Sequence, residues 1–392
     1  MIRIAAAALT LAAASAFAPS AGAYEPLVEK QVFETRDFQT FGGETIPELR
    51  LGWEAYGELN EARDNVILIT HFYTGNSHAA GRYTEEGPRG YWDEIIGSGK
   101  PIDTDRFYVV SVDSLANLGA GDPNVVTTGP ASIDPRTGEP YGLDFPVITI
   151  RDFVEAQKLV LDSLGVERLH AVMGASMGGL QAYEWAAAYP DRVDRVIPVI
   201  AAGWATGDLI GWLDMWSTPI RVDANWNGGD YYGGEPPAAG LAAALKLVTL
   251  HAQHWEWSNS VFGRQPAEGA DPLDSLGDRF AIEAALDAVG EARAATADAN
   301  HFLYLARANQ LFSTGHGDSP QEGLRAIEAP VMIIYTDEDL IFPEAAILET
   351  AAVIASDGTP ATLVELAGSR GHLDGVLSIA QAGDAIRAFL EE

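Results

Sequence analysis

The sequence predicts a three-layer α/β fold, in which helices cover both faces of a mainly parallel sheet. Short apolar runs without polar alternation are typical of parallel strands that are buried on both faces. Helical patterns separate several of these runs, and strands that alternate with helices favour a parallel sheet. A long stretch, residues 202–319, contains no convincing strand and predicts a helical insertion.

Seven apolar runs are the expected buried strands, and two amphipathic segments are the clearest helices between them. The helix over 152–164 ends at Gly165, and the helix over 177–189 ends before Pro190. The expected strands cover residues 49–56, 66–70, 107–112, 169–173, 196–200, 331–335 and 361–366.

The insertion at 202–319 differs from its surroundings in composition, because it holds six of the nine tryptophans of the chain. A Gly/Pro cluster at 228–237 marks a turn within it. We therefore expect a core formed by residues 24–201 and 320–392 and a helical lid formed by residues 202–319.

The N-terminus has the layout of a secretory signal peptide. Arg3 precedes an apolar run at 4–17, and Ala21-Gly22-Ala23 supplies a small-residue cleavage pattern. The run is shorter than the roughly 20 residues of a spanning helix; the alternative is an uncleaved N-terminal anchor. We expect a signal peptide at 1–23, cleavage near Ala23, and a secreted or periplasmic protein without stable membrane insertion.

The overall charge excludes several partners. The 392 residues include 24 basic and 56 acidic side chains, a formal net charge of −32. Such a surface repels phosphate backbones, so we expect no nucleic-acid partner. It also disfavours anionic ligands unless a local basic pocket overrides the net field. The absence of cysteine excludes disulfides and thiol nucleophiles.

The motif with the clearest chemistry is Gly174-Ala175-Ser176-Met177-Gly178, a G-x-S-x-G sequence between an apolar run and a helix. In this context the serine sits on a sharp turn above the sheet, which is the nucleophile turn of the α/β-hydrolase fold. The backbone N–H of Met177 and the helix N-terminus then point at the reacting carbonyl. We therefore predict an α/β-hydrolase fold with Ser176 as the nucleophile.

A serine hydroxyl needs a base, and in this fold an acid and then a histidine follow it in the chain. His372 follows the last expected strand and is the candidate base. Asp337, Glu338 and Asp339 follow the strand at 331–335, and spacing alone does not choose among them. A second oxyanion donor is expected in the loop 71–77.

Two patterns resemble metal sites but lack essential ligands. Residues 223–230 imitate the start of a calcium loop, whose twelfth position here is Gly234 instead of a bidentate glutamate. His251 and His254 lie one helical turn apart without an H-E-x-x-H pattern. We expect no metal and no cofactor.

Together with these motifs, further segments across nearly the whole mature chain resemble the homoserine O-acetyltransferase family. The matching segments are WEAYGELN at 53–60, TGNSHAAG at 74–81, GKPIDTDR at 99–106, TGPASI at 128–133, PYGLDFP at 140–146, TIRD at 149–152, SMGG at 176–179 and WNGGDYY at 226–232.

The resemblance implies a ping-pong mechanism, in which Ser176 takes an acyl group and passes it to a hydroxyl acceptor. It implies Asp339 as the acid, because the family's acid stands in a context like that of residues 339–343. It also implies an oxyanion-hole amide at Tyr73 beside that of Met177. The lid of this family often forms dimers, so a homodimer through the lid is one expected assembly.

Two positions depart from the family. Its lid arginine, which grips the carboxylate of homoserine, aligns with Ser217, and its aspartate after the catalytic histidine aligns with Leu373. Arg221 and Asp374 are the nearest charged substitutes, although both would have to be repositioned. Without this arginine and this aspartate, the carboxylate and the amine of a zwitterionic ligand would have no charged partners.

These observations predict a serine enzyme that transfers an acyl group from a small-molecule donor to water or to a hydroxyl compound other than homoserine. Homoserine acetylation belongs to cytoplasmic methionine synthesis and uses acyl-CoA, and an exported enzyme would rarely meet either reactant. The alternatives are a genuine homoserine O-acetyltransferase that uses acetyl-CoA, and a non-catalytic binding protein with the same fold.

Overall fold

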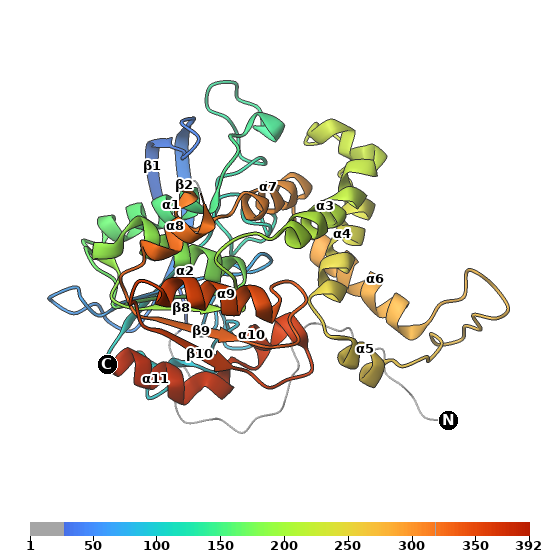
Figure 1. Ribbon diagram of the computed structural model, residues 1–392. Helices are drawn as coiled ribbons and strands as arrows, with labels where there is room; N and C mark the ends of the chain where they lie inside the picture. Colours follow the sequence, from blue (N-terminus) through green and yellow to red (C-terminus); the bar gives the residue numbers. More distant parts are fainter. Residues whose placement is uncertain (1–26, 318) are drawn as a thin grey trace.

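A computed structural model describes residues 27–317 and 319–392, and the predicted signal peptide at 1–23 lies outside them. An eight-stranded sheet forms the centre, in the order β1-β2-β6-β3-β7-β8-β9-β10 (Figure 1). A small second sheet pairs β4 with β5. The strands are β1 (Gln31–Gln39), β2 (Thr45–Tyr56), β3 (Val66–Thr70), β4 (Ile96–Gly97), β5 (Ile102–Asp103), β6 (Tyr108–Val112), β7 (Ala171–Ala175), β8 (Val196–Val199), β9 (Val331–Tyr335) and β10 (Ala361–Glu365).

The predicted three-layer α/β architecture is confirmed. The sheet is parallel from β6 to β10, whereas β1 and β2 pair antiparallel, as do β2 and β6. Strand β1 was not predicted, because most of its residues are exposed and polar. The run at 361–366 was expected to be buried, but β10 ends the sheet and its residues are largely exposed.

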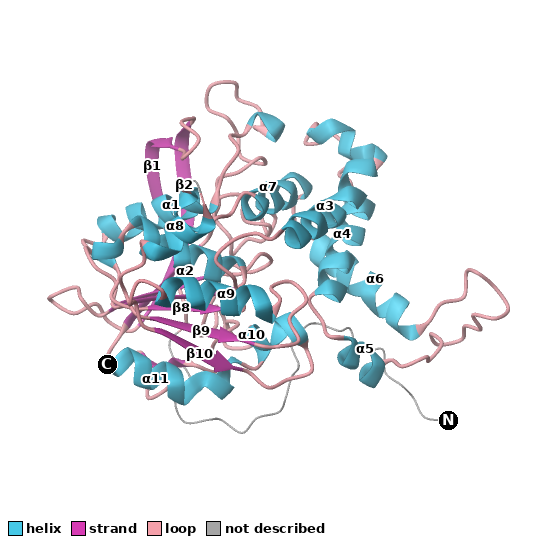
Figure 2. Ribbon diagram, viewed as in Figure 1, coloured by secondary structure: helices cyan, strands magenta, loops and turns pink. Residues whose placement is uncertain are grey.

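Both faces of the central strands are buried, as their apolar runs predicted. Along β3, Val66 and Leu68 pack into one hydrophobic cluster, whereas Ile67 and Ile69 pack into another. This alternation follows from the two-residue period of a strand. Helices α1, α2, α8 and α9 lie on one side of the sheet and α11 on the other (Figure 2).

The eleven α-helices of the described residues fall into two groups. Helices α3 to α7 lie in the chain between β8 and β9, within residues 202–319, and α3 to α6 extend to one side of the sheet (Figure 1). No helix of the described residues is long and apolar enough to cross a membrane. The helices are α1 (Ile150–Ser163), α2 (Met177–Ala188), α3 (Gly207–Val222), α4 (Ala238–His251), α5 (Trp255–Val261), α6 (Ala281–Ala294), α7 (Ala299–Gln310), α8 (Pro320–Arg325), α9 (Glu344–Ala355), α10 (Asp374–Leu377) and α11 (Gly383–Glu391).

The strand register brings distant loops to one edge of the sheet. Thr70, the last residue of β3, pairs with Gly174 near the end of β7. Strands β8, β9 and β10 run parallel to β7, so the loops after them open on the same edge. In open α/β sheets, ligands bind in the crevice outside these carboxyl ends.

Candidate active site

Ser176 occupies the sharp turn between β7 and α2. Its backbone has φ 56° and ψ −121°, a conformation that a residue with a side chain rarely adopts. Such strain persists only where the surroundings enforce it. Here the Ser176 N–H donates to the Val199 carbonyl at 2.9 Å, which ties the turn to β8.

Two glycines make the turn sterically accessible. A Cβ at Gly174 would lie 2.0 Å from the Thr70 hydroxyl oxygen, and one at Gly178 would lie 2.1 Å from the Thr70 carbonyl oxygen. The Thr70 hydroxyl also donates to the Gly178 carbonyl at 2.8 Å. The end of β3 therefore packs directly against the nucleophile turn, and only glycine fits at either position.

The structure brings Ser176, His372 and Asp339 into one hydrogen-bonded chain. The Ser176 hydroxyl lies 2.8 Å from His372 Nε2, and His372 Nδ1 lies 2.7 Å from Asp339 Oδ2. His372 and Asp339 are buried, whereas Ser176 is partly exposed. In this arrangement the imidazole can take the serine proton while the carboxylate orients the ring.

The geometry distinguishes the three neighbouring acids. Asp339 Oδ1 accepts hydrogen bonds from the backbone N–H groups of Ile341 and Phe342, at 2.7 and 3.0 Å, which leaves Oδ2 for His372. Asp337 is exposed. Glu338 points to the lid and lies 2.9 Å from His254 Nδ1. Among the three, Asp339 is the one that contacts the histidine.

Tyr73 and Met177, the predicted oxyanion donors, lie in the loop after β3 and at the start of α2. Met177 is the first residue of α2, so its N–H has no acceptor within the helix. Tyr73 lies in the loop after β3, and its hydroxyl donates to the Phe302 carbonyl on α7 at 2.6 Å. That bond joins the loop to the lid through the Tyr73 side chain and does not involve the Tyr73 backbone N–H.

His71 positions the start of the same loop. Its Nδ1 lies 2.9 Å from the Phe72 carbonyl oxygen, and its Nε2 accepts the Ser114 N–H at 3.0 Å. Burial lowers the pKa of His71, so the ring is neutral, which matches one donating and one accepting nitrogen. His71 therefore acts here as a hydrogen-bonding support.

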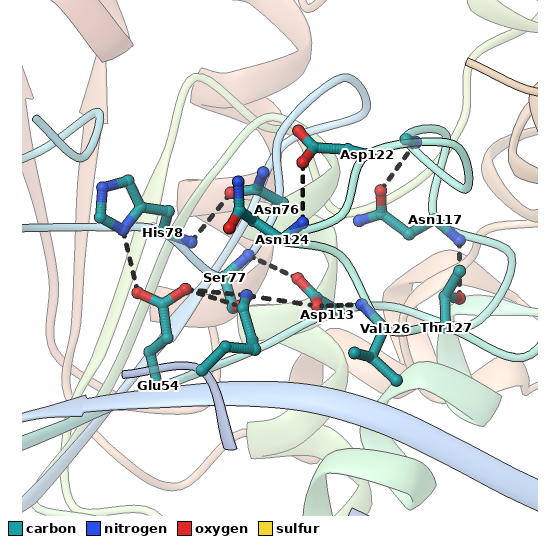
Figure 3. Close-up of polar contacts among 12 residues, drawn as sticks. Glu54, Asn76, Ser77, His78, Asp113, Asn117, Asp122, Asn124, Val126 and Thr127 are labelled. Carbon is teal, nitrogen blue, oxygen red and sulfur yellow. Dashed lines mark hydrogen bonds and ion pairs between the residues drawn. The ribbon is translucent and has the colours of Figure 1, made fainter. Parts of the chain in front are cut away.

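A charged network connects the buried residues Glu54, Ser77, His78 and Asp113 with the partly buried Lys30. Figure 3 labels the four buried members. Lys30 Nζ lies 2.7 Å from Glu54 and 3.4 Å from Asp113. His78 Nδ1 lies 3.0 Å from Glu54, and the Ser77 N–H donates to Asp113 at 2.8 Å. The loop that carries Tyr73 is thereby anchored to β2 and to the end of β6.

The network stabilises the ionised form of Glu54. Burial alone would raise the pKa of this carboxyl group, but the hydrogen bond from His78 and the charge of Lys30 outweigh it and lower the pKa to about 2. Sequence reasoning did not identify this network. The sequence signal was that Glu54, Ser77 and His78 fall within two of the family-like segments.

The residues predicted to bind the acceptor carry no free charge. Ser217 is fully buried on α3, and its hydroxyl donates to the Leu213 carbonyl at 2.7 Å. Leu373 follows His372 and donates its N–H to the Ala252 carbonyl of the lid at 3.3 Å.

Both charged substitutes already have partners. Arg221 pairs with Asp214 at 2.6 Å on the exposed side of α3. Asp374 is buried, and its carboxylate accepts the Arg370 N–H at 2.9 Å and the Ser378 hydroxyl at 2.6 Å. Asp374 therefore stabilises the turn after β10.

One cluster in the described residues has ligand atoms close enough for a metal ion. Atoms of His254, Glu256 and Glu338 lie within 4.8 Å of one another where the lid meets the loop after β9. Two of the three, His254 and Glu338, already form a pair. Their contact joins the lid to the loop that carries Asp339.

Comparison with known proteins identifies relatives that match most of the chain. A family model described as alpha/beta hydrolase fold matches residues 97–375. A homoserine O-acetyltransferase from Symbiobacterium thermophilum is 39% identical over 355 residues, which cover 89% of this chain and 91% of the relative.

Two solved structures have the same architecture. A homoserine O-acetyltransferase from Bacillus anthracis is 34% identical, with a TM-score of 0.90 over 94% of this chain and 98% of the other. An esterase is 49% identical, with a TM-score of 0.90 over 93% of this chain and 100% of the other.

Proposed function

Because this chain belongs to the homoserine O-acetyltransferase family of α/β-hydrolase enzymes, we propose that it transfers acyl groups through Ser176 to an acceptor other than homoserine. Water or a small hydroxyl compound is the proposed acceptor, so the enzyme acts as an esterase. The family membership rests on relatives above 30% identity that cover most of the chain.

The proposed reaction uses the chain Ser176–His372–Asp339. His372 takes the proton from the Ser176 hydroxyl as it attacks the ester carbonyl, and Asp339 stabilises the resulting imidazolium. The backbone N–H groups of Tyr73 and Met177 stabilise the oxyanion. His372 then gives its proton to the leaving alcohol, and an incoming water or alcohol releases the acyl group by the same steps in reverse.

The proposed acceptor rests on one observation, which is that neither Ser217 nor Leu373 offers a charge to a substrate. The Ser217 hydroxyl is fully buried and bonded to its own helix, and Leu373 has no charge. A zwitterionic amino acid needs a cation for its carboxylate and an anion for its amine. Burying either charge without a partner costs several kcal/mol.

Two further features support the proposal. The structural relative at 49% identity is an esterase, whereas the homoserine O-acetyltransferase structure is 34% identical. Export is also part of the proposal, since the predicted signal peptide would separate the enzyme from homoserine and acetyl-CoA.

The second candidate is a genuine homoserine O-acetyltransferase, which the curated relatives favour. The test is to assay the mature protein with para-nitrophenyl acetate and butyrate, and separately with acetyl-CoA and homoserine. We expect ester hydrolysis and no O-acetylhomoserine; the opposite result would support the second candidate. Ser176→Ala should lower kcat by about 10⁴-fold or more. Ser163→Ala, at an exposed position at the end of α1, is the matched control.

A further inference from the structure

Arg293, in the last turn of α6, is a partly buried cation without an acidic partner among the described residues. Its guanidinium donates to the hydroxyl oxygens of Thr249 at 2.9 Å and of Thr74 at 2.7 Å. Both partners are neutral. No ion pair joins Arg293 to a carboxylate of the described residues, and burial alone lowers its pKa.

Three other cations of the lid pair with acidic side chains, whereas its two remaining arginines have no such pair in the described residues but are exposed. Lys246 on α4 and Arg279 before α6 share the carboxylate of Asp287. Arg221 on α3 pairs with Asp214. Buried charges in proteins are normally paired or bind a ligand, because desolvation without compensation is costly. An arginine has five N–H donors, and the two threonine hydroxyls leave its positive charge uncompensated.

The contacts of Arg293 locate it beside the active site. Thr74 directly follows Tyr73, the proposed oxyanion donor. Thr249 is on α4, and Ala252, directly after α4, accepts the N–H of Leu373, the residue after the catalytic histidine, at 3.3 Å. The guanidinium therefore lies between the oxyanion loop and the lid helix that faces the catalytic histidine.

We propose that Arg293 forms an anion subsite, which selects substrates with a carboxylate or similar anionic group near the reacting ester. This inference rests on the proposed acyl-transfer function. The planar guanidinium suits a carboxylate, which can accept two parallel hydrogen bonds. With a net charge of −32, the protein repels anions elsewhere, so a local cation is needed to bind one.

The anionic group can belong to the acyl part or to the alcohol part of the ester, and matched substrates distinguish the two. On the acyl side, para-nitrophenyl hemiglutarate is compared with para-nitrophenyl butyrate. On the alcohol side, para-acetoxybenzoate is compared with its neutral methyl ester. The quantity measured is the ratio of kcat/KM for the acidic ester to kcat/KM for its neutral counterpart.

We expect Arg293→Met to lower this ratio by about 10-fold to 100-fold for one of the two pairs of esters, because the acidic ester loses a charge-assisted hydrogen bond. Arg293→Lys keeps the charge and should restore part of the ratio. Arg279→Met removes a partly exposed lid arginine that pairs with Asp287, and it should leave both ratios within about 2-fold. The pair that responds identifies the side of the ester that carries the anion.

Unchanged ratios for both pairs in Arg293→Met would overturn the proposal. If that variant does not fold, the unmodified enzyme still tests the proposal. An anion subsite requires that at least one acidic ester is cleaved with a kcat/KM as high as that of its neutral counterpart. A 10-fold preference for both neutral esters would overturn the proposal. Failure of the proposed function looks different, since neutral esters would then show no Ser176-dependent cleavage.

Discussion

The core side and the lid side of the active site differ in how their polar groups are used. On the core side, both oxygens of Asp339 accept hydrogen bonds, and Glu54 is held by Lys30 and His78. On the lid side, the Ser217 hydroxyl bonds to its own helix, and Arg293 has only neutral partners.

We interpret this difference as a division between a core side that catalyses the reaction and a lid side that binds the substrate. Fully hydrogen-bonded groups cannot reorient, so the core side is preorganised for catalysis. A cation with spare donors can still take a ligand, and our proposal therefore assigns substrate choice to the lid side. Changes on the core side should therefore reduce turnover of every substrate, whereas changes on the lid side should alter the preference among substrates.

The largest expected effect comes from the catalytic acid. Asp339→Asn keeps the shape of the side chain but removes the charge that orients His372, and we expect kcat to fall about 10⁴-fold for all esters. Asp337→Asn is the matched control, because Asp337 is exposed in the same loop. Steady-state kinetics measure both variants, and a larger loss in Asp337→Asn would contradict the assignment of Asp339.

A smaller effect is expected on stability at acidic pH. The pKa of Glu54 is lowered from 4.5 to about 2, so its ionised form stabilises the fold above pH 4.5 and this contribution is lost as the pH falls through 2. The shift corresponds to about 3 kcal/mol. Urea unfolding between pH 6 and pH 2 should show a flatter pH dependence in Glu54→Gln than in the unmodified protein.

Glu58→Gln is the control for this measurement, because Glu58 follows the same strand and is exposed. It should retain the pH dependence of the unmodified protein. If Glu54→Gln retained it as well, the buried network would not be what holds the ionised carboxylate.

The smallest effect is expected for Arg221→Met. Arg221 and Asp214 are both exposed, and a surface pair contributes about 0–1 kcal/mol. We expect kcat/KM for acidic and neutral esters to change less than about 2-fold. A selective loss with acidic esters would show that Arg221, and not Arg293, supplies the cation for the substrate.

Much of the core side could be predicted from the sequence. The G-x-S-x-G turn identified Ser176, and chain order identified His372, because both follow from local strand–turn–helix patterns. Three adjacent acids were indistinguishable by spacing, and resemblance to the family indicated Asp339. Only the direction of each side chain, with Asp337 exposed and Glu338 facing His254, separates them structurally.

The lid side and the charged network were not predictable in this way. Lys30 and Asp113 lie 83 residues apart and show no shared pattern in the sequence. Arg293 lies in an ordinary amphipathic helix, and nothing local distinguishes it from Arg279.

The sequence by itself therefore determined the α/β architecture and the nucleophile turn, since apolar periodicity and the G-x-S-x-G pattern are properties of residues adjacent in the chain. Only the tertiary structure decided which charges are paired and which are free. Whether a charge is compensated depends on distances to groups far along the chain. Partial burial without a carboxylate partner in the described residues distinguishes Arg293 from the other arginines of the lid, which are paired or exposed.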